Sequence, residues 1–173
     1  IYATGTVTDQ NGYADIIAAT TTMFRSGETA ACAVDANDCY RSGTSQCAFT
    51  SCSGNSCDIV CSADFYYFAD PTDAGTYAGE SWGAELVILD QSGLSATQTA
   101  PYVELLRLRA LSADNLIDYG SLEVNSNTGS YNATTTFTNI GNDAIDVLIE
   151  GSNLTDGLTS TIPASEQIFA TST

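Results

Sequence analysis

The cysteines constrain the fold of this chain more than any other feature. All six lie between Cys32 and Cys61 of a 173-residue chain, and the remainder has none. An even set of cysteines crowded into one short stretch predicts a disulfide framework, which forms in an oxidising compartment. We therefore expect an exported protein that works outside the cell, at the cell surface. Because the chain opens directly on a strand-like segment, we expect it to be a piece of a longer exported protein.

Sequence spacing alone leaves many disulfide connectivities open. A hairpin turning at residues 53–56 would bring the flanking cysteines together in pairs, and the two remaining cysteines would close a small acidic loop. The expected pairs are Cys32 with Cys39, Cys47 with Cys61, and Cys52 with Cys57. The competing interpretation is a zinc site of four thiolates. Against zinc, no CxxC pair occurs, and two thiols would be left over.

Two residue types that support many catalytic sites are missing. The chain contains no histidine, and its four basic residues are all arginine. Ser-His-Asp and Cys-His catalysis, lysine Schiff bases and the P-loop are therefore excluded. The net charge of −17 argues against nucleic acid, which requires a basic face. We expect no enzyme, no nucleic-acid partner, and no membrane insertion in this segment, since no apolar run is long enough to span a bilayer.

The pattern of residues predicts an all-β protein. Thr, Val, Ile, Tyr and Phe are common, and turn-forming residues separate short apolar runs. This spacing indicates sandwiches, and a change in composition near residue 100 indicates two of them. We expect one module over residues 1–100, with a cysteine-rich insertion at about 29–61. A second, short module spans 101–173.

Several local features are predicted within these modules. Asn11-Gly12 is typical of a β-hairpin turn. Alternation places Ile59, Cys61 and neighbouring residues of the same parity on a core face, and Trp82 is expected in the core of the sandwich. A second hairpin is expected between residues 131–138 and 144–150, with Ile145, Val147 and Ile149 facing inward.

Three stretches resemble parts of tandem immunoglobulin-like modules from large, uncharacterised surface proteins of bacteria and archaea. They are Val7–Gly12 with Ala14-Asp15-Ile16 and Phe24–Gly27; Phe68–Asp73 with Trp82; and Thr138–Asn142 with Ile145-Asp146-Val147 and Gly151. Such modules form stalks, surface layers, adhesins or filaments, so the resemblance implies a surface role and supplies no catalytic residue. The second module is shorter than the family pattern, which implies that it is incomplete or completed by a neighbouring strand.

Acidic turns offer candidate calcium sites, because calcium binds six to eight oxygen ligands. The first candidate combines Asp9, Asn11 and Asp15. The second is the loop closed by Cys32 and Cys39, which carries Asp35, Asn37 and Asp38. The alternative is that these are ordinary solvated turn residues. Calcium is the only cofactor that the sequence suggests.

Two sequons, at Asn132 and Asn153, are candidate glycosylation sites. Asn132 is expected to point outward from its strand, and Asn153 follows Gly151 in a loop. Chance sequons are common in a chain so rich in threonine.

Two functions are compatible with these observations. The first is a structural subunit of an extracellular assembly whose partners are copies of itself or neighbouring modules. Strand exchange would complete the short module, with residues 1–8 or 162–173 as donors. The alternative is an adhesin or carbohydrate-binding module that stacks sugars on aromatic side chains, for which the candidates are Tyr66, Tyr67, Tyr77 and, if it is not in the core, Trp82.

Overall fold

The chain folds into β-strands joined by turns and loops. The computed structural model describes residues 1–121, 123, 126–129 and 133–167. Within these residues there are eleven strands and four short 3-10 helices, and no α-helix. The all-β prediction is therefore confirmed. In the described part of the chain, no helix has the length and hydropathy that a membrane span requires.

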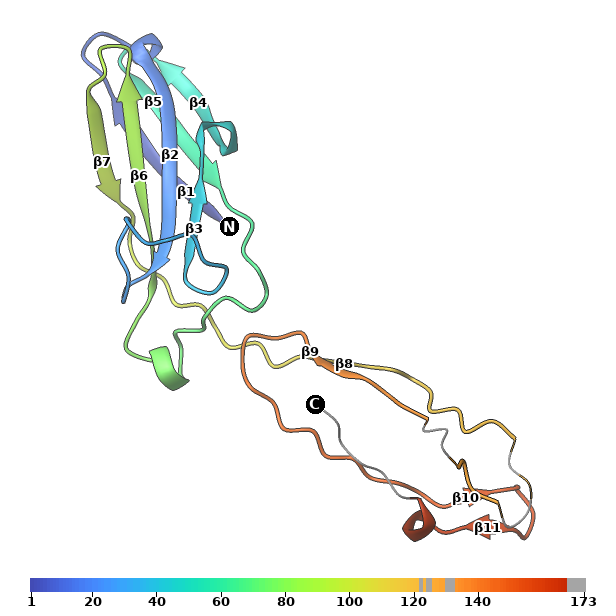
Figure 1. Cartoon of the computed structure of the whole chain (residues 1–173). Helices are drawn as coiled ribbons and strands as arrows, with labels where there is room; N and C mark the ends of the chain where they lie inside the picture. The colour runs from blue at the N-terminus through green and yellow to red at the C-terminus, as the bar shows by residue number, and fades with distance from the viewer. Residues whose placement is uncertain (122, 124–125, 130–132, 168–173) are drawn as a thin grey trace.

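The first hundred residues form two antiparallel sheets that face each other (Figure 1). One sheet has the order β1-β5-β4, and the other β3-β2-β6-β7. The strands of the first sheet are β1 (Tyr2–Thr8), β4 (Cys47–Ser53) and β5 (Ser56–Ser62). Those of the second are β2 (Ile16–Arg25), β3 (Cys39–Ser42), β6 (Trp82–Asp90) and β7 (Ser95–Thr99).

Alternation of side chains along the strands creates a single core between these sheets. In β5, Cys57, Ile59 and Cys61 are buried while the residues between them are partly exposed. From the other sheet, Met23 of β2 and Leu86 of β6 join the same apolar cluster. The predicted core face is confirmed for Ile59, Cys61 and Ala63, and Phe65 packs against the same core, but Tyr67, which was expected on this face, is exposed. The two sheets form a sandwich.

An aromatic group closes one end of this core. Trp82 is buried, as predicted, and its Nε1 donates a hydrogen bond to the carbonyl oxygen of Asp70 at 2.8 Å. Phe65 packs edge-on against Trp82, with ring centroids 4.6 Å apart, and stacks on Tyr40 at 4.1 Å. These contacts hold the long β5–β6 connection against the sandwich.

Two expectations about the first module need correction. The cysteine-rich stretch is not an insertion, because residues 39–62 supply β3, β4 and β5. Asn11-Gly12 does not form a hairpin turn: β1 pairs with β5 and β2 pairs with β3 and β6, so this turn crosses between sheets. In addition, β2 lies in the same sheet as β6 and β7. In constant-type immunoglobulin domains the second strand lies in the sheet opposite the sixth and seventh strands.

The first strand is not a free donor. β1 pairs with β5 over its full length, from Tyr2 opposite Ser62 to Thr8 opposite Ser56. The terminal ammonium group of Ile1 continues this pairing by donating to the carbonyl oxygen of Ala63 at 3.0 Å. Residues 1–8 are therefore bound within their own chain.

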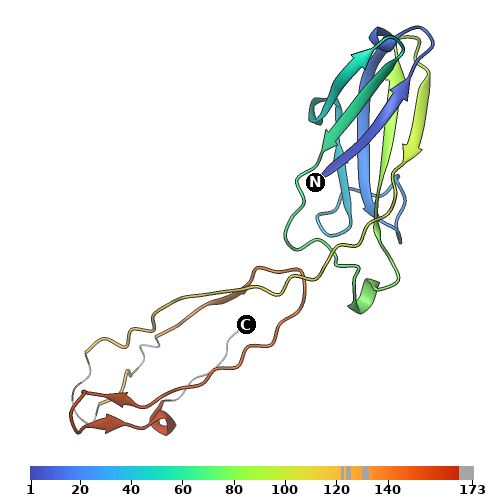
Figure 2. The same cartoon turned by 180° about the vertical axis from the view of Figure 1, so that it is seen from behind.

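Beyond residue 100 the chain leaves the sandwich at the end where Trp82 lies and runs outward in extended segments (Figures 1 and 2). Two small sheets form there, each a pair of antiparallel strands. They are β8 (Leu111–Ala113) with β9 (Phe137–Asn139), and β10 (Leu154–Thr155) with β11 (Thr161–Ile162).

The predicted hairpin between residues 131–138 and 144–150 is wrong. β9 pairs with β8, which lies upstream in the chain, and residues 144–150 form no strand. Val147 and Ile149 are exposed rather than facing a core. The turn at residues 139–143 instead folds against residues 108–110, where Ile140 N donates to the carbonyl oxygen of Ala110 at 2.9 Å.

Candidate functional site

Three carboxylates meet at the end of the sandwich that points away from the second half. Asp9, Asp15 and Asp90 each present an oxygen atom, and these atoms lie within 4.8 Å of one another. Asp9 and Asp15 flank the turn between β1 and β2, and Asp90 ends β6 opposite Ile16. The sequence pointed to Asp9 and Asp15 but missed Asp90, since only the pairing of β2 with β6 brings it close.

Asn11 contacts two of these three aspartates. Its backbone N–H donates to Asp9 Oδ1 at 2.7 Å, and its side-chain Nδ2 lies 3.4 Å from Asp15 Oδ2. The amide therefore offers hydrogen atoms to the carboxylates. A cation bound by the three aspartates would relieve their mutual repulsion and would need water molecules to complete its coordination.

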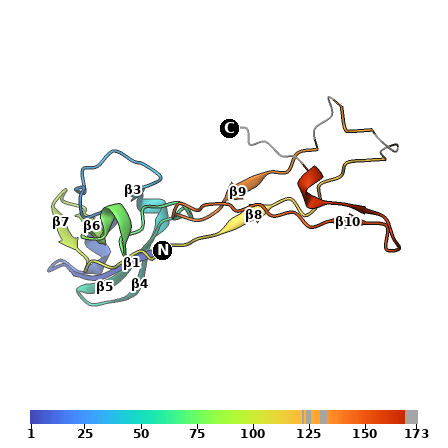
Figure 3. The same cartoon turned by 90° about the horizontal axis from the view of Figure 1, so that it is seen from below.

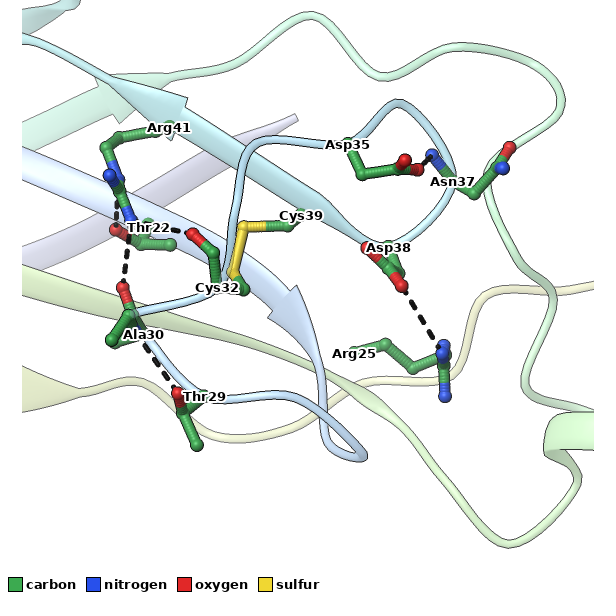
Figure 4. Close-up of a disulfide and its surroundings, with 11 residues drawn as sticks. Thr22, Arg25, Thr29, Ala30, Cys32, Asp35, Asn37, Asp38, Cys39 and Arg41 are labelled. Carbon is green, nitrogen blue, oxygen red and sulfur yellow. Dashed lines mark hydrogen bonds and ion pairs between the residues drawn. A yellow bond between two sulfur atoms is a disulfide. The ribbon is translucent and has the colours of Figure 1, made fainter.

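The second predicted calcium loop is used for structural contacts (Figure 4). Asp35 Oδ1 accepts a hydrogen bond from the backbone N–H of Asn37 at 2.7 Å. Asp38 faces the guanidinium group of Arg25, with 3.5 Å between Nη2 and Oδ2. Asp35 therefore caps the backbone of its own loop, and Asp38 pairs with Arg25.

Arg25 is the centre of an acidic cluster at the opposite end of the sandwich. Its side chain is 8% exposed and forms ion pairs with Asp38, Asp70 and Glu80. Its guanidinium carbon also lies 3.8 Å from the ring centroid of Tyr77. Nε is 3.3 Å from Asp70 Oδ2 without the geometry of a hydrogen bond, so this contact is electrostatic. One cation thus connects β2, the disulfide loop and two points of the β5–β6 connection.

Within this cluster the surroundings favour the charged form of Arg25 but disfavour the charged form of Asp70. Burial tends to lower the pKa of Arg25, but the hydrogen bond to Glu80 and the nearby acids outweigh it, and the pKa is raised. Burial raises the pKa of Asp70; attraction to Arg25 opposes this, and repulsion from Asp38 and Asp35 adds to it. The Asp70 carboxylate therefore carries a net cost when it is charged.

The three expected disulfides are all present, and the zinc interpretation is wrong. Cys32 is bonded to Cys39, Cys47 to Cys61, and Cys52 to Cys57. The last two bridges join β4 to β5, with Cys47 directly opposite Cys61 in the register. Arg41 supports the remaining loop by donating from Nη2 to the carbonyl oxygens of Ala30 and Cys32 (Figure 4). Three disulfides indicate an oxidising, extracellular environment.

Of the two candidate glycosylation sites, Asn153 lies in the described part of the chain. Asn132 lies outside the described residues. Asn153 is exposed just before β10, and its Oδ1 accepts a hydrogen bond from the backbone N–H of Ala164 at 2.9 Å. Its amide nitrogen, the atom to which a glycan would be attached, is not used in that bond.

The second half exposes many large hydrophobic side chains, which the sequence analysis did not locate. Every buried hydrophobic side chain that the structure describes lies between Ala3 and Leu86. Beyond residue 100, many large hydrophobic side chains are exposed, among them Leu106, Leu116, Val147, Leu148, Ile149, Leu158 and Ile162. Leu148 and Leu158 are 83% and 87% exposed. Soluble monomers rarely leave so many large apolar residues in one region uncovered, and such patches mark interaction surfaces.

Contacts at the junction keep this apolar region attached to the sandwich. Arg107 reaches Asp73 on the sandwich side and Asp143 on the other, and Arg109 Nε lies 2.6 Å from Asp143 Oδ2. Leu105 also exchanges hydrogen bonds with Thr72 at 2.8 and 2.9 Å. These contacts give the outward segments a fixed starting point, from which they extend (Figure 3).

Comparison with known proteins identifies no relative of this chain. No protein-family model, no curated protein and no solved structure matches this chain.

Proposed function

We propose that this chain is a structural subunit of an extracellular assembly at the cell surface, a filament, a stalk or a surface layer. The observation that carries the proposal is the set of large hydrophobic side chains that lie exposed among the described residues beyond residue 100, where the structure describes no buried hydrophobic side chain. Covering them with copies of the same chain, or with neighbouring modules of a larger surface protein, would remove them from water. The resemblance to tandem immunoglobulin-like surface modules supports the same function, with the second module completed by its neighbours.

The disulfides and the charge fit this role. Covalent bridges between β4 and β5 strengthen a small sandwich that must persist outside the cell. A net charge of −17 makes copies repel at low salt, so assembly should require salt or divalent cations to screen it. We propose no enzymatic activity, because the chain has no histidine and no lysine.

Sedimentation velocity tests the proposal most simply. The purified chain is measured over a range of concentrations, in low and in high sodium chloride, and the same samples are viewed by negative-stain electron microscopy. We expect species larger than the monomer, growing with concentration and salt, and ordered filaments or sheets on the grid. Monomers under every condition would refute the assembly role.

One observation supports the alternative of an adhesin or carbohydrate-binding module. Tyr66, Tyr67 and Phe68 are exposed and pack on one another, with the Tyr66 and Phe68 rings stacked at 5.2 Å. Flat aromatic surfaces of this kind can stack against sugar rings. Dispersed monomers that bind defined glycans on an array, and lose binding on Tyr66→Ala, would favour this function.

A further inference from the structure

An open groove runs along one side of the sandwich, between the first and the last strand. Its walls are residues 4–8 of β1 and Ala96, Thr97, Gln98 and Ala100 at β7, and its floor is formed by Ile59, Leu86 and Ile88. The groove encloses about 280 Å³. Gly5 keeps it open, because a Cβ there would lie 3.1 Å from Leu86 Cδ1. None of the lining residues is charged.

Both walls of this groove are sheet edges. β1 pairs only with β5, and β7 pairs only with β6, among the described strands. Each therefore has one row of backbone N–H and C=O groups without a strand partner. Two such edges facing one uncharged groove with a hydrophobic floor form a site for an additional strand, which would gain backbone hydrogen bonds and side-chain burial together.

Residues 144–150, Ala-Ile-Asp-Val-Leu-Ile-Glu, have the properties of that strand. They run outward as an extended segment (Figure 1) and make no backbone–backbone hydrogen bond to another described residue. Ile145, Val147 and Ile149 share one side of an extended chain, since side chains alternate. All three are β-branched, which suits a strand.

The segment is held at both ends within its own chain. Asp143 is paired with Arg107 and Arg109 on one side. On the other side, Gln167 Nε2 donates to the carbonyl oxygen of Ser152 at 2.8 Å. These contacts hold the segment beyond the end of its own sandwich, so it is presented to another molecule, and its ordering cost on binding is reduced.

We infer that residues 144–150 of one copy insert as a strand between β1 and β7 of a second copy. This inference rests on the proposed function and identifies the contact that builds the assembly. The lengths agree, since residues 145–149 match the five residues of β1 that line the groove. The charges agree as well: with the apolar triplet facing the floor, Asp146 and Glu150 point away from the groove. Two strongly acidic copies thus meet through an uncharged surface. Because the donor and acceptor are different surfaces, the contact is heterologous and propagates from copy to copy.

Two pairs of variants test the inference by sedimentation velocity of the full chain in high salt. Val147→Asp places a charge on the side that faces the groove, whereas Leu148→Asp places the same charge one residue away, on the outer side. Ala96→Glu blocks the acceptor wall, and Ser95→Glu on the same strand lies outside the groove. All four positions are at least partly exposed, and thermal melting of each variant verifies that the sandwich remains folded.

We expect Val147→Asp and Ala96→Glu each to weaken association at least about tenfold, because a charge would enter an apolar site. Leu148→Asp and Ser95→Glu should stay within about threefold of the unmodified chain. If the unmodified chain associates and all four variants associate equally well, the inference is overturned and the assembly role stands. If the unmodified chain remains monomeric, both are overturned. An equal loss of association in Val147→Asp and Leu148→Asp would also contradict the inference, because the inference requires that only one side of the strand faces the groove.

Discussion

Replacing Arg25 with methionine should unfold the sandwich far more easily than replacing any other arginine. Arg25 is nearly buried and is the only cation among Asp38, Asp70 and Glu80 in the described structure. Methionine has a similar length and keeps part of the apolar contact. The substitution therefore removes the charge and the hydrogen bonds, and leaves three carboxylates close together without a counter-ion.

The size of the effect follows from burial. Removing one partner of a buried ion pair costs about 3–5 kcal/mol, because the remaining charge is uncompensated. The three acids are 20–26% exposed, so water stabilises them in part, and we expect a loss near the lower end, about 3 kcal/mol. For a domain of this size, such a loss corresponds to a decrease in Tm of roughly 12–24 °C.

Thermal and urea unfolding, monitored by circular dichroism, measure this loss. Arg41→Met is the matched control: Arg41 is exposed and donates only to a hydroxyl group and two backbone carbonyls, so its loss should cost at most about 1 kcal/mol. Arg25→Lys should lie between the two, because a lysine keeps the charge but cannot contact three acids at once.

The dependence on pH provides a second check. Burial raises the pKa of Asp70 and Arg25 opposes this, so without Arg25 the pKa of Asp70 should rise further above its unfolded value. Acids with raised pKa values destabilise the fold when they are charged, and this cost disappears as the pH falls below the unfolded pKa near 4. The difference between the two proteins should thus be largest at pH 7 and shrink towards pH 4. A loss below about 1 kcal/mol at pH 7, or a loss independent of pH, would show that Arg25 is not the centre of this cluster.

Three further predictions concern the disulfides, the carboxylate group and the junction. Replacing Cys47 and Cys61 with serine should cost about 3 kcal/mol, and replacing Cys52 and Cys57 about 2 kcal/mol, because the first pair closes the longer loop; urea unfolding that gives the reverse order would contradict this. Calcium should raise the Tm of the unmodified chain but not of Asp90→Asn, and an unchanged melting curve for both would leave Asp9, Asp15 and Asp90 as ordinary surface acids. Hydrogen bonding to Arg109 lowers the pKa of Asp143, so nuclear magnetic resonance titration should place that pKa below 3.8, and Arg109→Gln should raise it. The ion pair contributes stability at pH values above the unfolded pKa of Asp143, and this contribution is lost as the pH falls through the lowered pKa of the folded state. Identical pKa values of Asp143 in the unmodified chain and in Arg109→Gln would refute the ion pair.

Local features of the sandwich could be predicted from sequence, because they depend on neighbouring residues. The turn at residues 53–56 fixed the β4–β5 hairpin, and with it the pairs Cys47–Cys61 and Cys52–Cys57. Alternation identified the buried face of Ile59 and Cys61. Each of these predictions needed only the geometry of a strand or a short turn.

Features that depend on distant pairing were missed. A turn such as Asn11-Gly12 can join two paired strands in a hairpin or connect two different sheets. The pairing of β1 with β5 shows that it connects two sheets here. The same holds for Asp90, which joins Asp9 and Asp15 through the register of β2 and β6. Residues 144–150 alternate as a strand should, but alternation does not specify which strand is the partner.

Hydrogen exchange of residues 101–167, measured by mass spectrometry before and after assembly, tests the central claim most directly. If other copies complete the second half, peptides covering residues 144–150 should exchange rapidly in dilute low-salt protein and slowly in the assembled state. Peptides from β1 and β7 should gain protection together with them, while the already paired strands β2 and β6 change little. Equal exchange of residues 144–150 in both states, or full protection in the isolated monomer, would contradict the account.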